Sequence, residues 1–185
     1  MSSSKKLLVV VDMQNDFLTG VLGSAEAEAI IQNVAEFVKN YKGDIVFTQD
    51  THNAGENTVE ASRIPEHCIQ GTHGWDIEPS IIKAFNENKY ANRNSNFGDP
   101  ADNVYIKPTF GSAELYEDLM YNFQYDEIEF IGVCTDICVI SNALVARAAR
   151  PDAIIKVHSG LCAGTSPAKH EAALSVMESC LIDVV

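Results

Sequence analysis

Hydrophobic residues along the chain form two kinds of pattern: short unbroken apolar runs and longer stretches with helical spacing. The run at residues 7–11 is uninterrupted and predicts a strand buried on both faces. Residues 25–41 carry apolar side chains three and four positions apart and predict an amphipathic helix. Further strands are predicted at residues 44–48, 104–107, 127–133, 154–158 and 181–185. Further helices are predicted at residues 80–86, 113–121, 137–150 and 167–179.

This β-α-β alternation is typical of an α/β fold, in which helices cover both faces of a parallel sheet. Two polar stretches, residues 50–79 and 86–103, are rich in Asn and Gly and predict long excursions. Loops of that length in a compact domain are usually functional or disordered. Because ligands bind beyond the carboxyl ends of such strands, the residues that directly follow each strand are the candidates for chemistry.

The composition limits the partners and the compartment. A length of 185 residues fits a single domain over residues 1–185. The chain has 26 acidic and 13 basic residues, a formal net charge of −13, so its surface repels nucleic acid and anionic membranes. No apolar stretch reaches the roughly 18 residues that predict a membrane span. The 5 cysteines leave at least one free thiol, and we expect a reducing, cytoplasmic setting.

Two charged residues stand at the ends of predicted strands. Asp12 follows the first strand, where an acid is typical of a turn or a helix cap but is also placed to act as a general base. Lys107 ends a later strand and precedes Pro108, which holds the backbone extended at that point. Most lysines are simply solvated, but a lysine fixed at this edge can pair with a carboxylate or steady a thiolate.

Cys138 lies at the junction between a predicted strand and the helix that follows it. Cysteine is often a buried structural residue. A thiol in the first helical turn, however, experiences the positive end of the helix dipole, which favours the thiolate. The unpaired amides of a first turn can also bind a developing oxyanion. Cys134, four residues earlier, is an alternative partner for Cys138 in a disulfide or a metal site.

The loop after the second strand carries a pattern of metal ligands. Asp50 and His52 form a D-x-H sequence, His67 follows later in the same loop, and Glu60 lies between them. Nitrogen and oxygen ligands of this kind suit a divalent ion, although the same side chains can equally be solvated. His73 is a further candidate ligand, although a lone histidine is more often structural, and His158 and His170 lie outside any cluster.

Five sequence blocks in a fixed order carry a more specific signal than any one of them. They are residues 10–17 (VVDMQNDF), 48–52 (TQDTH), 65–72 (PEHCIQGT), 107–112 (KPTFGS) and 132–139 (GVCTDICV). With these blocks the chain resembles the isochorismatase-like cysteine hydrolases, and within them the nicotinamidases, over almost its whole length. The resemblance implies a six-stranded parallel sheet between two helical layers, a three-layer α-β-α fold of the Rossmann-like, doubly wound kind.

The resemblance also implies a catalytic triad of Asp12, Lys107 and Cys138. It implies a cis peptide bond between Val133 and Cys134, which directs the Cys134 amide, together with the Cys138 amide, at an oxyanion. In this scheme Asp12 takes the proton of Cys138, the thiolate attacks an amide carbon, and a thioester is formed and hydrolysed. Cys134 then contributes its backbone rather than its sulfur.

The metal site and the substrate pocket follow by the same resemblance. The implied ligands are those of the loop pattern above, with Glu60 matching a ligand found in some relatives: Asp50, His52, Glu60 and His67. Zinc is the expected ion, and iron or manganese are alternatives. Phe17 and Phe110 match two aromatic residues that sandwich the pyridine ring in nicotinamidases, whereas the third ring-stacking position is Ile64, which is not aromatic.

The activity implied is hydrolysis of a small amide, nicotinamide to nicotinate and ammonia. Ile64 keeps open an alternative in which the same machinery acts on another amide, carbamoyl or ureido compound. Isochorismatases proper lack the metal site and cleave a vinyl ether, so the candidate ligands disfavour that chemistry. A non-catalytic binding protein is disfavoured because competent residues fill every triad and metal position. Relatives are often dimers or tetramers, so we expect a homo-oligomer.

Overall fold

The computed structural model describes residues 5–91 and 103–185. Its strands are β1 (Lys6–Val11), β2 (Asp44–Asp50), β3 (Val104–Lys107), β4 (Glu127–Val133), β5 (Ile154–Ala163) and β6 (Asp183–Val184). Its α-helices are α1 (Asn15–Leu18), α2 (Ala25–Asn40), α3 (Pro79–Glu87), α4 (Ala113–Glu117), α5 (Ile140–Ala149) and α6 (Pro167–Ser179). Two π-helical turns, η2 (Asp118–Asn122) and η3 (Thr135–Val139), precede or follow α-helices.

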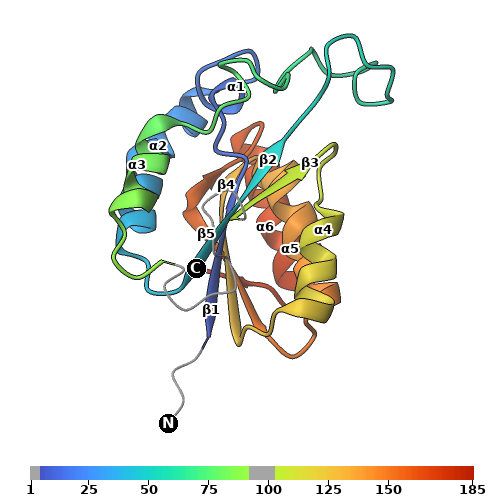
Figure 1. Ribbon diagram of the computed structural model, residues 1–185. Coiled ribbons are helices and arrows are strands. Elements are labelled where there is room, and N and C mark those ends of the chain that lie inside the picture. The colour runs from blue at the N-terminus through green and yellow to red at the C-terminus, as the bar shows by residue number, and fades with distance from the viewer. Residues whose placement is uncertain (1–4, 92–102) are drawn as a thin grey trace.

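The strands form one six-stranded sheet in the order β3-β2-β1-β4-β5-β6, and every pairing between them is parallel. Helices α2 and α3 cover one face, and α4, α5 and α6 cover the other (Figure 1). The predicted α/β fold with a six-stranded parallel sheet between two helical layers is therefore confirmed.

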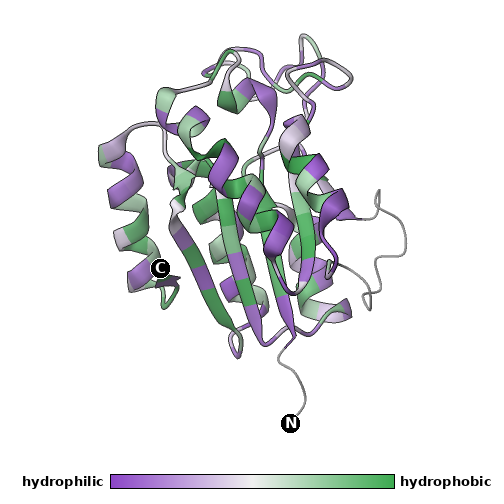
Figure 2. Ribbon diagram, turned by 90° about the vertical axis from the view of Figure 1, so that its left-hand side faces the viewer, coloured by the Kyte–Doolittle hydropathy of each residue, from purple (hydrophilic) through white to green (hydrophobic). Residues whose placement is uncertain are grey.

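The first strand shows why an unbroken apolar run forms the centre of this sheet. Successive side chains of β1 point to opposite faces. Leu7, Val9 and Val11 pack in the core beneath α5 and α6, whereas Leu8 and Val10 pack in the core beneath α2 and α3. The hydropathy colouring shows mostly hydrophobic strands (Figure 2). Full burial of each such side chain stabilises the fold by about 1.5–3 kcal/mol.

Helix α2 shows how the helical layers are fixed. The Ser24 side chain accepts a hydrogen bond of 3.1 Å from the Ala27 amide and caps the first turn. Its buried residues recur at helical spacing and face the sheet: Ala27, Ile30, Ile31, Val34 and Val38. Among the described residues no helix is both long and apolar enough to cross a membrane.

The structure departs from the predicted elements in three places. Strand β5 continues to Ala163, past an irregular pairing with β4. Its second half was not predicted because His158, Ser159 and Gly160 interrupt the apolar run. Helix α1 was not predicted, since four residues are too short to show a helical period. The predicted helices at 113–121 and 137–150 each contain a π-helical turn. Of the predicted excursion at 86–103, residues 92–102 lie outside the described part of the chain.

Gly132 sets how closely β1 and β4 approach at the end that carries the candidate residues. It has φ 116°, a conformation that side chains rarely adopt. A Cβ atom at this position would lie 2.1 Å from the Val11 carbonyl oxygen. Only glycine therefore fits between the last residue of β1 and the segment that leads to Cys134.

We predict that Gly132→Ala lowers the free energy of unfolding by at least about 2 kcal/mol, because it adds both a steric clash and an unfavourable φ. For a chain of this size that is a fall in Tm of roughly 4–8 °C. Thermal unfolding followed by circular dichroism measures it. Gly160→Ala is the matched control, since a Cβ there meets no atom within 4 Å. Equal Tm values for the two variants would contradict the role given to Gly132.

Candidate active site

Four candidate residues meet at the carboxyl edge of the sheet because four neighbouring elements end there. Asp12 directly follows β1, Asp50 ends β2, Lys107 ends β3, and Cys138 lies in η3 after β4. Asp50 and Lys107 are partners in the register of the parallel pair β2–β3. All four side chains are buried.

The Lys107 ammonium group links the other two members of the predicted triad, Asp12 and Cys138. Its Nζ atom lies 2.7 Å from Asp12 Oδ2 and 3.6 Å from Cys138 Sγ. Asp12 itself has φ 47°, a left-handed conformation that Asp tolerates better than most residues. The Thr48 hydroxyl donates a 2.6 Å hydrogen bond to Asp12 Oδ1, whereas Asp12 Oδ2 has only the ion pair with Lys107.

Burial and mutual charge shift the pKa of each triad member. Burial raises the pKa of Asp12, and the nearby positive charge of Lys107 only partly opposes it. Burial lowers the pKa of Lys107, but the negative charges of Asp12 and Asp50 outweigh it, so Lys107 stays protonated. Burial, with the Asp12 charge, raises the pKa of Cys138 well above that of an ordinary thiol. Burial and the Asp12 charge therefore oppose the thiolate that the helix terminus was expected to favour.

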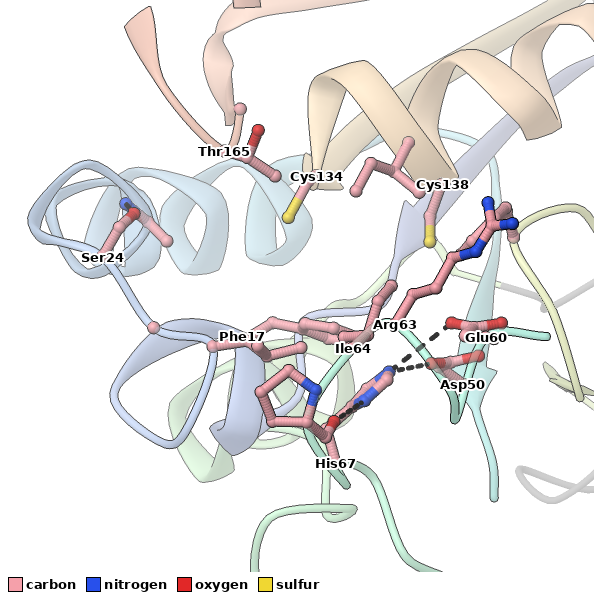
Figure 3. A pocket seen from close by; sticks show the side chains of 17 residues that line it. Phe17, Ser24, Asp50, Glu60, Arg63, Ile64, His67, Cys134, Cys138 and Thr165 are labelled. Atoms are coloured by element: carbon pink, nitrogen blue, oxygen red, sulfur yellow. Dashed lines mark hydrogen bonds and ion pairs between the residues drawn. The ribbon is translucent and has the colours of Figure 1, made fainter. Parts of the chain in front are cut away.

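The backbone before the Cys138 thiol contains the predicted cis peptide bond. The peptide bond between Val133 and Cys134 is cis. Cys134 directly precedes η3, and its sulfur faces the same cavity as that of Cys138 (Figure 3). Both are free cysteines, so the alternative of a disulfide between them is not adopted.

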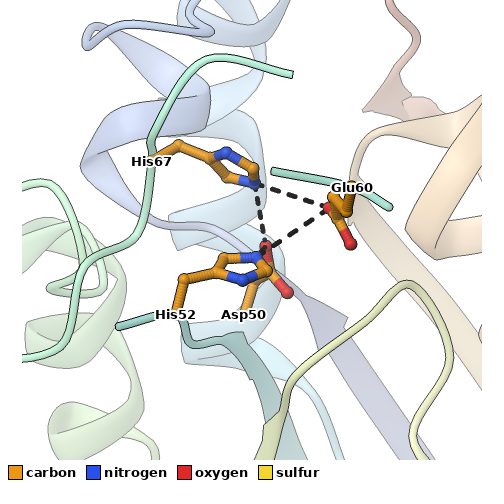
Figure 4. Close-up of side chains that lie close together, drawn as sticks. All are labelled: Asp50, His52, Glu60 and His67. Atoms are coloured by element: carbon orange, nitrogen blue, oxygen red, sulfur yellow. Dashed lines mark hydrogen bonds and ion pairs between the residues drawn. The ribbon is translucent and has the colours of Figure 1, made fainter. Parts of the chain in front are cut away.

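The loop residues predicted as metal ligands also come together. One ligand atom from each of Asp50, His52, Glu60 and His67 lies within 4.8 Å of every other (Figure 4). The His52 and His67 Nε2 atoms lie 3.1 Å and 3.2 Å from the same oxygen, Asp50 Oδ2. Their distances to Glu60 Oε1 are 3.9 Å and 3.7 Å. Neither Cys134 nor Cys138 belongs to this cluster.

The surroundings of the two histidines fit a divalent ion. His52 Nδ1 lies 2.7 Å from Glu56 Oε1, and His67 Nδ1 lies 2.8 Å from the Pro65 carbonyl oxygen. Hydrogen bonds at Nδ1 leave the Nε2 lone pair of each ring directed at the cluster, which is the arrangement that metal-binding histidines usually show. Two nitrogen and two oxygen donors suit zinc, and also iron or manganese.

The remaining histidines lie elsewhere, as predicted for His158 and His170, and the candidate His73 is not part of the cluster. His158 Nε2 lies 2.6 Å from Glu129, His170 Nδ1 lies 2.8 Å from Thr135, and His73 contacts Asn15. None of these three belongs to the metal-ligand cluster.

Beside the triad and the cluster lies a cavity of about 360 Å³, a size typical of a small-molecule site. Phe17, Ile64 and Phe110, the three residues predicted to contact substrate, all line it, together with Cys138. Figure 3 shows Phe17 and Ile64 on the side of His67, with the two cysteine sulfurs opposite. A carboxamide in this cavity can therefore be held between apolar side chains and reach the thiol.

Three contributions to the site were not predicted. Asn142 donates hydrogen bonds to the Phe110 carbonyl oxygen at 3.1 Å and to the Cys138 carbonyl oxygen at 2.8 Å, and so ties the loop after β3 to the nucleophile. Its position four residues after Cys138, on an apolar helix face, is the signal that identifies it. The second contribution is the Glu56 carboxylate, which lies 2.7 Å from His52 Nδ1. Its position four residues after His52 is the corresponding signal in the sequence. Arg63 also lines the cavity, and no sequence pattern indicates it.

Comparisons with known proteins agree with this geometry. A family model described as the isochorismatase domain matches residues 6–185. The nicotinamidase/pyrazinamidase of Mycobacterium tuberculosis is 31% identical over 195 aligned positions, which cover 97% of this chain and 98% of that protein. The solved structure of Pyrococcus horikoshii pyrazinamidase in complex with zinc has a TM-score of 0.75, with 26% identity and 98% of each chain covered. A pyrazinamidase/nicotinamidase from Streptococcus mutans UA159 has a TM-score of 0.81 at 24% identity, covering 98% of this chain and 100% of that one, and shows the shared fold.

These relatives confirm the predicted enzyme class, a hydrolase that acts on the carbon–nitrogen bonds of amides. The family model spans the chain from β1 to its last residue and includes the residues of the predicted triad and the metal-ligand cluster. The chain belongs to the isochorismatase domain family.

Proposed function

We propose that this protein is a cysteine amidohydrolase that converts a small carboxamide to the acid and ammonia, with nicotinamide or pyrazinamide as the first candidate substrate. One observation carries the proposal. Lys107 Nζ stands between Asp12 Oδ2, at 2.7 Å, and Cys138 Sγ, at 3.6 Å, and Cys138 lines a cavity that fits a small amide. Those three residue types supply a base, a cation and a nucleophile.

The first half of the reaction makes the thioester. Because burial raises the pKa of Cys138, the thiol is neutral at rest and needs a proton acceptor. Asp12 is that acceptor, and its own raised pKa makes it a better base than an ordinary carboxylate. The Cys138 sulfur forms a bond to the amide carbon, and the backbone amides of Cys134 and Cys138 hold the oxyanion.

Loss of ammonia completes the thioester, and water then releases the acid. Asp12 gives its proton to the amide nitrogen, the carbon–nitrogen bond breaks, and ammonia leaves, since an amine departs only when protonated. Asp12 then takes a proton from water, whose oxygen attacks the thioester carbon. The carbon–sulfur bond breaks, the acid is released, and Cys138 recovers its proton from Asp12. Lys107 stays protonated throughout and offsets the negative charge that moves between Asp12 and Cys138.

The metal-ligand cluster positions the substrate in this proposal. Asp50, His52, Glu60 and His67 would hold a divalent ion. Zinc is the simplest choice, since the solved structure of the Pyrococcus horikoshii pyrazinamidase is a complex with zinc. When bound, the ion supplies a Lewis-acid anchor for a ring nitrogen of the substrate. Phe17 and Phe110 supply apolar walls for the ring.

Ile64 favours a second candidate function of the same kind. It lines the cavity where nicotinamidases have a third aromatic side chain, so the pocket gives a flat ring one fewer stacking surface. The same triad would then act on another small amide or a ureido compound.

We predict that Cys138→Ala abolishes ammonia release from every amide that the wild-type enzyme hydrolyses and leaves Tm within about 3 °C of the wild type, since it removes one sulfur atom from a buried site. The test panel is nicotinamide, pyrazinamide, aliphatic amides and carbamoyl compounds. Cys180→Ala is the control, because Cys180 is a free cysteine at the end of α6 that does not line the cavity. Near-normal turnover by Cys138→Ala would rule out the thioester mechanism.

For the metal-ligand cluster, we expect about one divalent ion per chain in protein purified without chelator, measured by elemental analysis. His67→Ala should reduce the bound metal at least tenfold because it removes one of four donor atoms. His73→Ala removes a histidine outside the cluster and should retain the metal. A metal content that is unchanged in His67→Ala would show that the ion is held elsewhere.

Lys107→Met should lower the free energy of unfolding by about 3–5 kcal/mol, because it leaves the Asp12 and Asp50 carboxylates buried without their cation. Adding Asp12→Asn should recover part of the loss. Chemical denaturation in the presence of chelator measures both values.

The pH dependence of Lys107→Met has a definite sign. Burial raises the folded-state pKa of Asp12, so the folded form holds the proton more tightly than the unfolded form. Without Lys107 this shift grows, and the stability deficit should shrink as pH falls from about 7 to 5. A deficit that widened over that range would contradict the assignment.

A further inference from the structure

Arg63 lies in a tight turn that carries several residues of the cavity wall. Its amide and that of Ile64 both donate hydrogen bonds of 2.9 Å to the Glu60 carbonyl oxygen. Glu60, Arg63 and Ile64 all line the cavity, as does Pro65 immediately after them. In Figure 3 the Arg63 side chain points toward the part of the cavity that holds Cys138, Asp50 and Glu60.

The acidic groups of the cavity already have partners. Asp50 lies 3.2 Å from Lys107 and is flanked by His52 and His67 at 3.1 Å and 3.2 Å. Glu60 lies 3.7 Å from His67 Nε2. Lys107, in turn, pairs with two carboxylates and is 1% exposed, so it has no free side toward a substrate.

Arg63 differs from these groups. Within residues 5–91 and 103–185, its guanidinium group makes no hydrogen bond or ion pair, although the chain has a net charge of −13. It is exposed, yet it borders a cavity whose other walls are mostly apolar. A guanidinium group with all its donors free, beside an apolar cavity, is suited to bind a carboxylate through two parallel hydrogen bonds.

We propose that Arg63 determines substrate specificity by binding an anionic group of the substrate. The substrate is then a small carboxamide or ureido compound that also carries a carboxylate: the amide reaches Cys138, and the carboxylate pairs with Arg63. This inference rests on the proposed amide hydrolysis and narrows its substrate class: it favours the second candidate function, with an anionic amide or ureido compound, over the neutral nicotinamide and pyrazinamide. It also gives a reason for Ile64, because a substrate held by its charge needs less ring stacking from the neighbouring residue.

Two pairs of amides test the proposal, each pair differing by one carboxylate. They are propanamide with succinamate, and nicotinamide with 5-carbamoylpyridine-3-carboxylate. The measurement is kcat/KM for ammonia release, expressed as the ratio of the anionic to the neutral amide. Arg63→Gln should lower this ratio at least about tenfold, the effect of losing a charge-assisted hydrogen bond, and mainly through KM.

Two further variants exclude a general effect of charge. Arg63→Lys should retain part of the preference, since it keeps the charge and loses the paired donors. Lys89→Gln removes one positive charge from an exposed site that does not line the cavity, and should leave the ratio unchanged. Raising the salt concentration should lower the ratio in the wild type and not in Arg63→Gln. A ratio that changes less than twofold in Arg63→Gln would overturn the proposal.

A binding measurement separates this proposal from the proposed reaction. Calorimetry on Cys138→Ala protein compares the affinities for the anionic amides with Arg63 present and with Arg63→Gln added. We expect Kd to rise at least about tenfold in the double variant. If hydrolysis proves independent of Cys138, the reaction mechanism fails and this comparison still decides the role of Arg63. If the anionic amides do not bind to Cys138→Ala protein, or bind equally well to both proteins, the specificity role is wrong.

Discussion

The candidate site depends on one buried cation. Removing an ammonium group from water costs several kcal/mol, so a lysine that is 1% exposed is stable only with negative partners in good geometry. Asp12 and Asp50 supply them at 2.7 Å and 3.2 Å. They are available because β1, β2 and β3 are neighbours in a parallel sheet and end at the same edge. The topology thus brings the two carboxylates to Lys107, and the ion pairs in turn require those strands to keep their register.

Asp50 connects the two halves of the site. Its Oδ1 atom lies 3.2 Å from Lys107, while its Oδ2 atom lies 3.1 Å and 3.2 Å from the two histidines. A charge at the metal-ligand cluster therefore changes the field that Lys107 experiences, and Lys107 stands 3.6 Å from the Cys138 sulfur. In the proposed function, a cation held by the cluster would draw negative charge away from Lys107 and leave more of its positive charge to stabilise the thiolate.

The parts of the site that follow strands could be predicted from sequence, because strand ends are visible as the limits of apolar runs. Asp12, Asp50, Lys107 and Cys138 all lie at such limits. The protonation state of Cys138 could not, since it depends on the depth of burial and on the distance to Asp12, which the spacing of residues does not encode. Arg63 was missed for a related reason: no periodic pattern in an irregular loop shows which side chains face a cavity.

The arrangement separates the residues of the proposed chemistry from those that select the substrate. Asp12, Lys107 and Cys138 stand on the rigid sheet and on η3, where packing on both faces fixes their positions. Arg63 and Ile64 belong instead to an exposed turn, whose sequence can change without disturbing the core. The same loop also supplies Glu60 and His67 to the cluster, which ties the turn to Asp50 on the sheet. A change of side chain at the turn can therefore alter what the cavity accepts, while the cluster keeps the turn at a fixed distance from the nucleophile.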